Sequence, residues 1–302
     1  MTDVTAPVEY HRTLSGDHRR IGRGILAIVL LIGGSQAFAI ILTTGAALID
    51  AAIGTPERAG FTPLTYAAGM ASVALLLPWS VLIQRWLYEV PARSLSSVTS
   101  RFRWEIVGRS LVLLGPAFVI ILVIQYWEPL PQTTWAHLDV VWLLAIALLL
   151  APLQAAGEEY GFRGLIFRVA GSWSRDPRIG LILGIAVSST LFAAIHYSTS
   201  GWLNLWYLVF AVGTALITWR TGGLETAVMM HALYNTLSFV FDAALSVDPS
   251  VATDRTEGAV TIAVLTPSIV VIAATVVVLV ATRRTGPALT PGAPTPKPAE
   301  TP

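Results

Sequence analysis

Apolar residues in this chain are gathered into eight long runs separated by short polar loops. The runs cover residues 21–42, 64–87, 110–127, 140–153, 179–197, 203–219, 224–245 and 259–281. About 20 apolar residues are enough for a helix to cross the hydrocarbon core of a bilayer. The alternating ten-residue strands of a transmembrane barrel do not occur in the sequence. We therefore predict an all-α, polytopic membrane protein with about eight transmembrane helices.

The positions of the basic residues predict how these helices are oriented. Lys and Arg are concentrated before residue 21, in the loops 85–109 and 163–178, at Arg220 and after residue 282. The alternate loops, 50–63, 128–139, 198–202 and 246–258, contain only Arg58 and Arg255. Because Lys and Arg accumulate in cytoplasmic loops, we expect both termini to lie in the cytoplasm.

The two ends of the chain differ from its apolar body. Residues 1–20 are polar and unpatterned, so we expect a mobile cytoplasmic tail, and residues 285–302 are rich in Pro and Thr, which predicts disorder. Ala37-Phe38-Ala39 resembles a signal-peptidase site. We favour an uncleaved first helix, because the apolar run continues past this site and a long tail precedes it.

Composition agrees with a membrane protein and excludes several kinds of chemistry. Only 12% of the residues are charged, against about 25% in an average soluble domain. A net charge of +1 gives no indication of nucleic-acid binding. The absence of cysteine excludes disulfides, thiolate metal ligands and a cysteine nucleophile.

An ionisable cluster, Glu158, Glu159 and Arg163, directly follows the fourth apolar run. Such a cluster at membrane depth is a functional-site hypothesis by default. Glu159 and Arg163 are four residues apart, so they can form an ion pair on a helix. Glu158 is rotated by about 100° from Glu159 on a helix of 3.6 residues per turn, which leaves it without a local partner. The structural alternative is a folding clamp at a helix end.

Two further polar groups lie in later apolar runs. One is His196, within Phe192-x-x-x-His196, and the other is His231-x-x-x-Asn235. A lone histidine near a helix end is more often structural than catalytic. His and Asn also commonly hydrogen-bond between membrane helices, so the second pair has an equally simple structural explanation.

Taken together, a carboxylate, two histidines and an amide suit hydrolysis. Glu158 would act as the general base, and histidine or asparagine would donate hydrogen bonds to the oxyanion. The same residues also suit a zinc ion held by His196, His231 and Glu158, with water in the open position. A serine nucleophile is less favoured, because Ser and Thr are ordinary packing residues in membrane helices.

The ordered set Glu158-Glu159-x-x-x-Arg163, Phe192-x-x-x-His196 and His231-x-x-x-Asn235 resembles the CPBP family. These are the CAAX-processing and bacteriocin-processing intramembrane proteases, also called the Abi or CAAX prenyl protease 2-like family. The resemblance implies that Glu158 activates water and that Arg163 holds Glu159. It also implies that His196 orients the water or binds zinc, and that His231 and Asn235 stabilise the oxyanion. Both a zinc-dependent and a metal-independent reaction remain open.

The function that the resemblance implies is an intramembrane endopeptidase in the bacterial plasma membrane. Its catalytic core would lie at 140–245 within a membrane domain of residues 21–284. Its partners would be the lipid bilayer and membrane-associated peptides or proteins, prenylated CAAX-type or bacteriocin-like. The alternatives are a non-enzymatic scaffold or bacteriocin-immunity protein and, less favoured, a proton-coupled transporter, for which we would expect internal repeats.

The depths of the two histidines conflict in this prediction. His231 follows the Gly222-Gly223 turn by about seven residues, which places it about 10–12 Å deep at 1.5 Å per residue. His196 comes eighteen residues after Arg178 and would lie near the opposite membrane face. The two can meet if the fifth helix is tilted, starts outside the bilayer or adjoins a re-entrant segment. We predict a water-filled cavity there, open to the cytoplasm.

Overall fold

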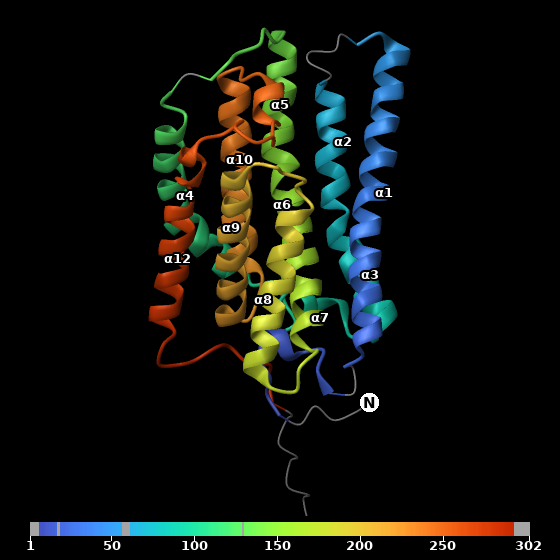
Figure 1. Ribbon diagram of the computed structural model, residues 1–302, viewed down its shortest axis with the longest axis vertical. Coiled ribbons are helices and arrows are strands. Elements are labelled where there is room, and N and C mark those ends of the chain that lie inside the picture. Colours follow the sequence, from blue (N-terminus) through green and yellow to red (C-terminus); the bar gives the residue numbers. More distant parts are fainter. Residues whose placement is uncertain (1–5, 17–18, 56–60, 129, 293–302) are drawn as a thin grey trace, which may run out of the picture.

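The computed structural model describes residues 6–16, 19–55, 61–128 and 130–292, and this part of the chain is helical throughout (Figure 1). It has three isolated β-bridges and no strand among these residues. The α-helices are α1 (Ile21–Ile53), α2 (Pro63–Ala74), α3 (Leu76–Tyr88), α4 (Trp104–Gln125), α5 (His137–Leu149), α6 (Ala151–Glu159), α7 (Phe167–Gly171), α8 (Pro177–Ala194), α9 (Gly201–Thr221), α10 (Glu225–Ala244), α11 (Pro249–Ala252) and α12 (Ser268–Ala281). Short 3-10 helices cover Tyr10–Arg12, Ala92–Leu95 and Ile262–Leu265, and a π-helix covers Tyr160–Ile166. The predicted all-α fold is confirmed.

Seven helical segments of the described chain are long and apolar enough to cross a membrane. Pro63–Tyr88 counts as one of them and His137–Gly171 as another, so α2 with α3, and α5 to α7, each form one span. The eighth long helix, α10, is not among the seven, because it is too polar to be counted as a membrane span by its mean hydropathy. It packs against α4, α5, α6 and α9, so protein surrounds its polar residues. With α10 included, the arrangement agrees with the eight predicted helices.

Both described ends of the chain lie at one end of the helix bundle (Figure 1). We call it the basic end, because the arginine-rich segments 89–103 and 172–178 lie there too. An even number of crossings brings the chain back to the side from which it started. That this side is the cytoplasm remains a prediction from the positions of the basic residues.

The described parts of both tails contact the basic end of the bundle. Tyr10 and Leu14 are fully buried, and the Tyr10 hydroxyl donates a hydrogen bond to the Leu95 carbonyl. Glu9 forms an antiparallel bridge with Leu289 of the C-terminal tail. The N-terminal segment thus closes the basic end with apolar side chains. Mobility of residues 1–20 and disorder of residues 285–302 remain predictions, and residues 1–5, 17–18 and 293–302 lie outside the described part.

The first helix is continuous for 33 residues and is longer than its predicted apolar run. It passes through Ala37–Ala39 without a break, and the Thr43 hydroxyl donates to the Ala39 carbonyl at 2.7 Å. The sequence that resembles a cleavage site therefore lies inside a regular helix. An uncleaved first helix remains our prediction.

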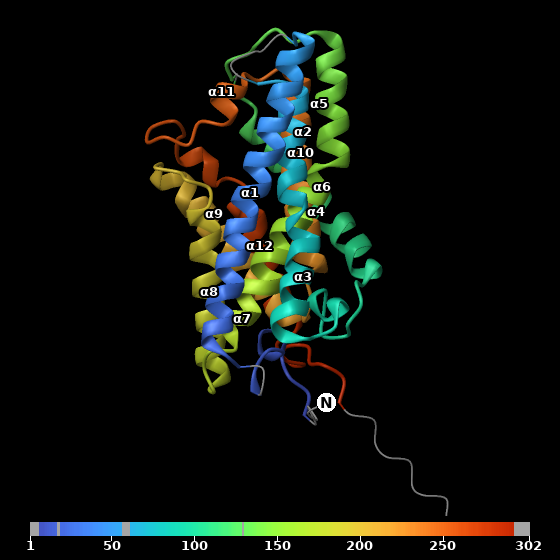
Figure 2. The same cartoon turned by 90° about the vertical axis from the view of Figure 1, so that its right-hand side faces the viewer.

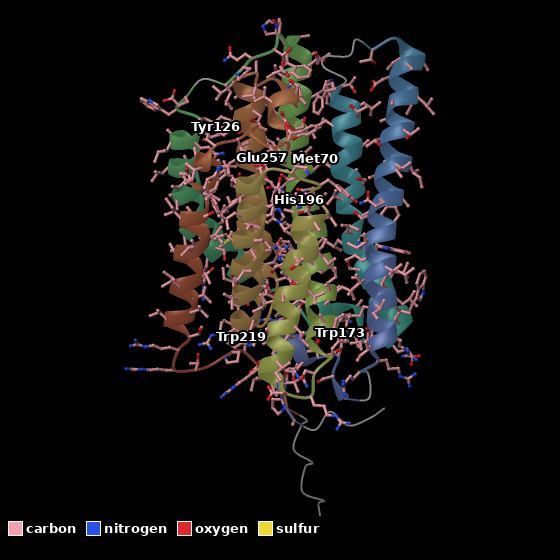
Figure 3. All side chains as sticks on the ribbon, in the orientation of Figure 1. Met70, Tyr126, Trp173, His196, Trp219 and Glu257 are labelled. Carbon is pink, nitrogen blue, oxygen red and sulfur yellow. The ribbon has the colours of Figure 1, made fainter. Side chains whose placement is uncertain are left out.

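The hairpin of α8 and α9 resolves the conflict over depth. Helix α8 begins beyond the level at which α1 begins, at the basic end (Figures 1 and 2). After 18 residues it ends near the middle of the bundle, and α9 returns from there. His196, just after α8, lies at about half the height of the bundle (Figure 3). The sequence allowed a fifth helix that is tilted, starts outside the bilayer or adjoins a re-entrant segment. In the structure the fifth predicted helix is α8, and it starts beyond the level at which α1 begins.

Candidate active site

Three elements bring the six predicted site residues together in the middle of the bundle. The end of α6 and the following π-helix supply Glu158, Glu159 and Arg163. The residues after α8 supply His196, and α10, which packs along α6, supplies His231 and Asn235.

Close helix packing places the two glutamates. Gly157 faces α2 so closely that an added Cβ would collide with the Val73 carbonyl oxygen, so only glycine fits there. Directly after Glu159 the helix widens into the π-helix Tyr160–Ile166. Such segments are rare and are frequent at functional sites. Glycine thus allows α6 to approach α2 while its carboxylates face α10.

Glu159 contacts both Arg163 and His231 and is completely buried. Its Oε1 lies 3.2 Å from Arg163 Nη1, so the predicted ion pair is present. The same oxygen lies 2.8 Å from His231 Nδ1. The Arg163 guanidinium also lies 4.1 Å from the centroid of the Phe192 ring, a cation–π contact. Glu159 therefore joins Arg163 to His231 as well as forming the expected helix clamp.

Glu158 is not without a local partner, contrary to our prediction. Gln154, one turn earlier on α6, donates to Glu158 Oε1 from Nε2 at 2.9 Å. Gln154 Oε1 in turn accepts a hydrogen bond from Asn235 Nδ2 at 2.8 Å. We missed Gln154 in the sequence, although a polar residue four positions before Glu158 in an apolar run was the available signal.

His231 lies between the two carboxylates. Nδ1 faces Glu159, and Nε2 lies 3.4 Å from Glu158 Oε2. Because Glu159 is paired with Arg163, it is the acceptor, and His231 Nδ1 carries the donated proton. The second contact is within ion-pair distance, but Glu158 Oε2 makes no hydrogen bond among the described residues.

His196 adjoins this cluster in a defined tautomer. Its Nδ1 lies 2.7 Å from the Phe192 carbonyl oxygen, which can only accept, so Nδ1 is protonated and neutral Nε2 has a lone pair. The ring stacks on Tyr207 at a centroid distance of 4.0 Å. The Phe192 ring contacts both imidazoles, at 4.8 Å from His196 and 6.1 Å from His231. The two histidine rings are therefore no farther apart than the sum of these distances.

The site is closed in this conformation. The side chains of Glu158 and His231 are 8% and 6% exposed, and Glu159 and Arg163 are more deeply buried. Glu158 and His231 are therefore largely covered in this conformation, and the water-filled cavity open to the cytoplasm remains a prediction. The opposite charges lie close together, which lowers the cost of burying them, although Glu158 Oε2, Glu159 Oε2 and both Arg163 Nη atoms make no hydrogen bond among the described residues.

The side chains do not form the zinc site that we considered. Among the described residues, no group of three or more His, Cys, Asp or Glu side chains is arranged to hold a metal ion. His231 directs both ring nitrogens at carboxylates, and His196 uses Nδ1 for a carbonyl. The predicted set of His196, His231 and Glu158 is thus not assembled as a ligand set.

The fold and the site define a multi-pass membrane protein with a buried carboxylate–imidazole cluster. Residues 137–237, about a third of the chain, match the family model of the type II CAAX prenyl endopeptidases, Rce1-like. This segment contains all six predicted site residues, and the match confirms the resemblance inferred from the motifs.

One curated protein is also similar, the uncharacterised protein YyaK of Bacillus subtilis (strain 168). It is 26% identical over 174 residues, which are 55% of this chain and 57% of YyaK. The chain thus spans little more than half the length of this relative. No solved structure matches the chain.

Proposed function

We propose that this protein is an intramembrane endopeptidase that hydrolyses peptide bonds of membrane-associated substrates with water activated by Glu158. The observation that carries this proposal is the position of His231 between the buried carboxylates of Glu158 and Glu159, beside His196. A base, a cation and a second imidazole with a lone pair thus lie in one buried cluster. The family match over residues 137–237 supports the same reaction class.

Glu158 is the group in this cluster that suits a general base. Its Oε2 is buried and makes no hydrogen bond within the described residues. With His231 as imidazolium, Glu158 is an unprotonated carboxylate. A water that donates one hydrogen to Glu158 Oε2 and the other to His196 Nε2 is both oriented and activated.

The reaction then balances without a further reactant. The water oxygen attacks the carbonyl carbon as one of its protons passes to Glu158. When the C–N bond breaks, this proton passes to the leaving nitrogen, which gives an amine and a carboxylic acid. The second proton of the water then passes from the acid to the amine, so the final products are a carboxylate and an ammonium group. Asn235 has a second N–H besides the one given to Gln154, and the His231 imidazolium supplies positive charge for the oxyanion. Arg163 pairs with Glu159, and Glu159 holds the His231 ring.

The substrate classes come from the resemblance. A prenylated CAAX-type tail and a bacteriocin-like peptide are both amphipathic chains that partition to a membrane. The Bacillus relative supports the bacterial plasma membrane as the location. In either case the closed site has to open before a peptide reaches Glu158.

The alternative is a non-enzymatic scaffold or immunity protein, and the closure of the site favours it. Paired, buried charges can also serve only to fix helix packing. The two functions differ in one respect: a scaffold needs the Glu159–Arg163 pair but does not need the carboxylate of Glu158 as a base.

Peptide cleavage by the purified, membrane-reconstituted protein tests the proposal. Prenylated CAAX-type and unprenylated hydrophobic peptides are compared with the wild type and with Glu158→Gln, His196→Ala and His231→Ala. Glu128→Gln, in an exposed loop, is the matched control. We expect cleavage to be lost in the three site variants and kept in the control. Unchanged cleavage in all three would refute the assignment, and a chelator arm separates a metal-free from a zinc-dependent reaction.

A further inference from the structure

A basic cavity lies at the basic end of the molecule, away from the six site residues. It has a volume of about 540 Å³ and is lined by Arg12, Gly16, Arg19 and Arg175. The first three belong to the N-terminal segment, and Arg175 belongs to the loop between α7 and α8. Trp173 of the same loop is at this end of the molecule in Figure 3.

Backbone carbonyls hold two of the arginines in place. Arg12 Nη1 donates to the carbonyls of Gly171 and Ser174 at 2.9 Å and 2.7 Å. Arg19 Nε donates to the Trp173 carbonyl at 3.0 Å. Carbonyl oxygens fix the guanidinium groups but leave their positive charges in place. Within the described residues, the two Nη groups of Arg19 make no hydrogen bond, so they can act as donors to a ligand.

Within the described residues, Arg12, Arg19 and Arg175 form no salt bridge with a carboxylate. Asp17 lies outside the described residues. Glu9 and Asp176 are close enough to influence Arg12, but both are engaged elsewhere. Glu9 accepts from Trp219, and Asp176 caps α8 through the backbone N–H groups at its start. Burial lowers the pKa of Arg12, and the charge of Arg19 acts in the same direction.

A phosphate group matches what the cavity offers. Guanidinium groups bind phosphate through paired, charge-assisted hydrogen bonds, and a bound anion would offset the repulsion between the arginines. We propose that this cavity binds a phosphate group, carried by an anionic phospholipid or by a soluble phosphate.

The surroundings of the cavity suit a lipid. The first turns of α1 pack on Trp173, since an added Cβ at Gly24 would meet the Trp173 ring at 2.6 Å. Ile21 and Ile25 on α1 are 49% and 53% exposed. A headgroup in the cavity would therefore leave its acyl chains beside an apolar helix face. Basic pockets at the membrane boundary bind anionic headgroups in this way.

The test uses the full-length protein and measures binding, so its result is independent of peptide cleavage. One arm titrates inorganic phosphate. The other compares vesicles of pure phosphatidylcholine with vesicles that also contain phosphatidic acid. The pocket variant is Arg19→Gln with Arg175→Gln; Arg12 is left unchanged because it holds the loop carbonyls. The control is Arg283→Gln with Arg284→Gln, which removes the same charge from exposed positions.

We expect the pocket variant to bind the phosphate ligand at least about tenfold more weakly, because each charge-assisted hydrogen bond contributes about one such factor. The control should change by less than about twofold, as for screened surface charges. Loss in the lipid arm alone identifies a headgroup site, and loss in both arms identifies a site for soluble phosphate as well. Equal losses in the two variants, or no preference for phosphatidic acid and no phosphate binding by the wild type, would overturn the proposal.

Discussion

Gln154 joins Glu158 to Asn235, so the change Gln154→Leu tests whether this connection positions the site. Leucine keeps the size and helix-forming tendency of the residue but removes both hydrogen bonds, at 2.9 Å and 2.8 Å. Glu158 loses a donor and Asn235 loses an acceptor. If Gln154 acts in positioning, the activity should fall by more than the stability explains.

The expected loss of stability and the expected loss of activity in Gln154→Leu differ in size. An unsatisfied buried polar group costs about 1–3 kcal/mol. Glu158 keeps its contact with His231, and Asn235 is only half-buried. We therefore expect Gln154→Leu to lower the free energy of unfolding by about 1–2 kcal/mol, at the lower end of that range. A misplaced catalytic group costs up to about 100-fold in rate. We therefore expect kcat to fall by about 10- to 100-fold with KM within about twofold.

The assay is the initial rate of cleavage of a fluorogenic peptide over a range of substrate concentrations, with thermal unfolding measured in parallel. Gln36→Leu replaces a half-buried glutamine of α1 and should leave kcat unchanged. Gln154→Glu retains an acceptor for Asn235 but sets a like charge beside Glu158, so it should lose more activity than Gln154→Leu. A Gln154→Leu protein with the kcat of the wild type would contradict the positioning role.

Three further predictions concern the surroundings of the site. Arg163→Leu leaves Glu159 as an unpaired buried carboxylate and should lower the free energy of unfolding by about 3–5 kcal/mol in denaturant titrations. Gly157→Ala forces α6 away from α2, and the same measurement should show a loss of about 1–3 kcal/mol. Arg255, from the loop after α11, donates to the His196 carbonyl at 2.8 Å. Arg255→Ala should therefore reduce kcat about tenfold, the factor that corresponds to one hydrogen bond, with little change in melting temperature.

The glycine and the loop arginine have matched controls. An added Cβ at Gly69 of α2 would meet nothing within 4 Å, so Gly69→Ala should be neutral or stabilise by up to about 1 kcal/mol. Arg255→Lys keeps a donor and should recover part of the activity lost in Arg255→Ala. Equal unfolding energies for the two glycine variants would show that α6 and α2 do not need their close approach. Equal kcat for Arg255→Ala and the wild type would show that the loop does not position His196.

Much of the fold could be predicted from the sequence because the bilayer leaves the chain few choices. Backbone groups in hydrocarbon must be satisfied within a helix, so each long apolar run becomes one. The Glu159–Arg163 ion pair could also be predicted from the sequence, because two residues four positions apart lie on the same face of a helix. Gln154 has the same spacing from Glu158 and was open to the same reasoning.

Contacts between helices were decided only by the tertiary structure. His231 and Glu159 are 72 residues apart, and their hydrogen bond depends on how far α10 is shifted along α6. The depth of His196 depends on where α8 begins, which a count of residues from the nearest loop placed wrongly. The burial of Tyr10 and Leu14 likewise depends on where the helices leave room at the basic end. Sequence spacing determines geometry within one helix, whereas the offsets between helices arise from packing, and the contact between Glu158 and His231 depends on such an offset.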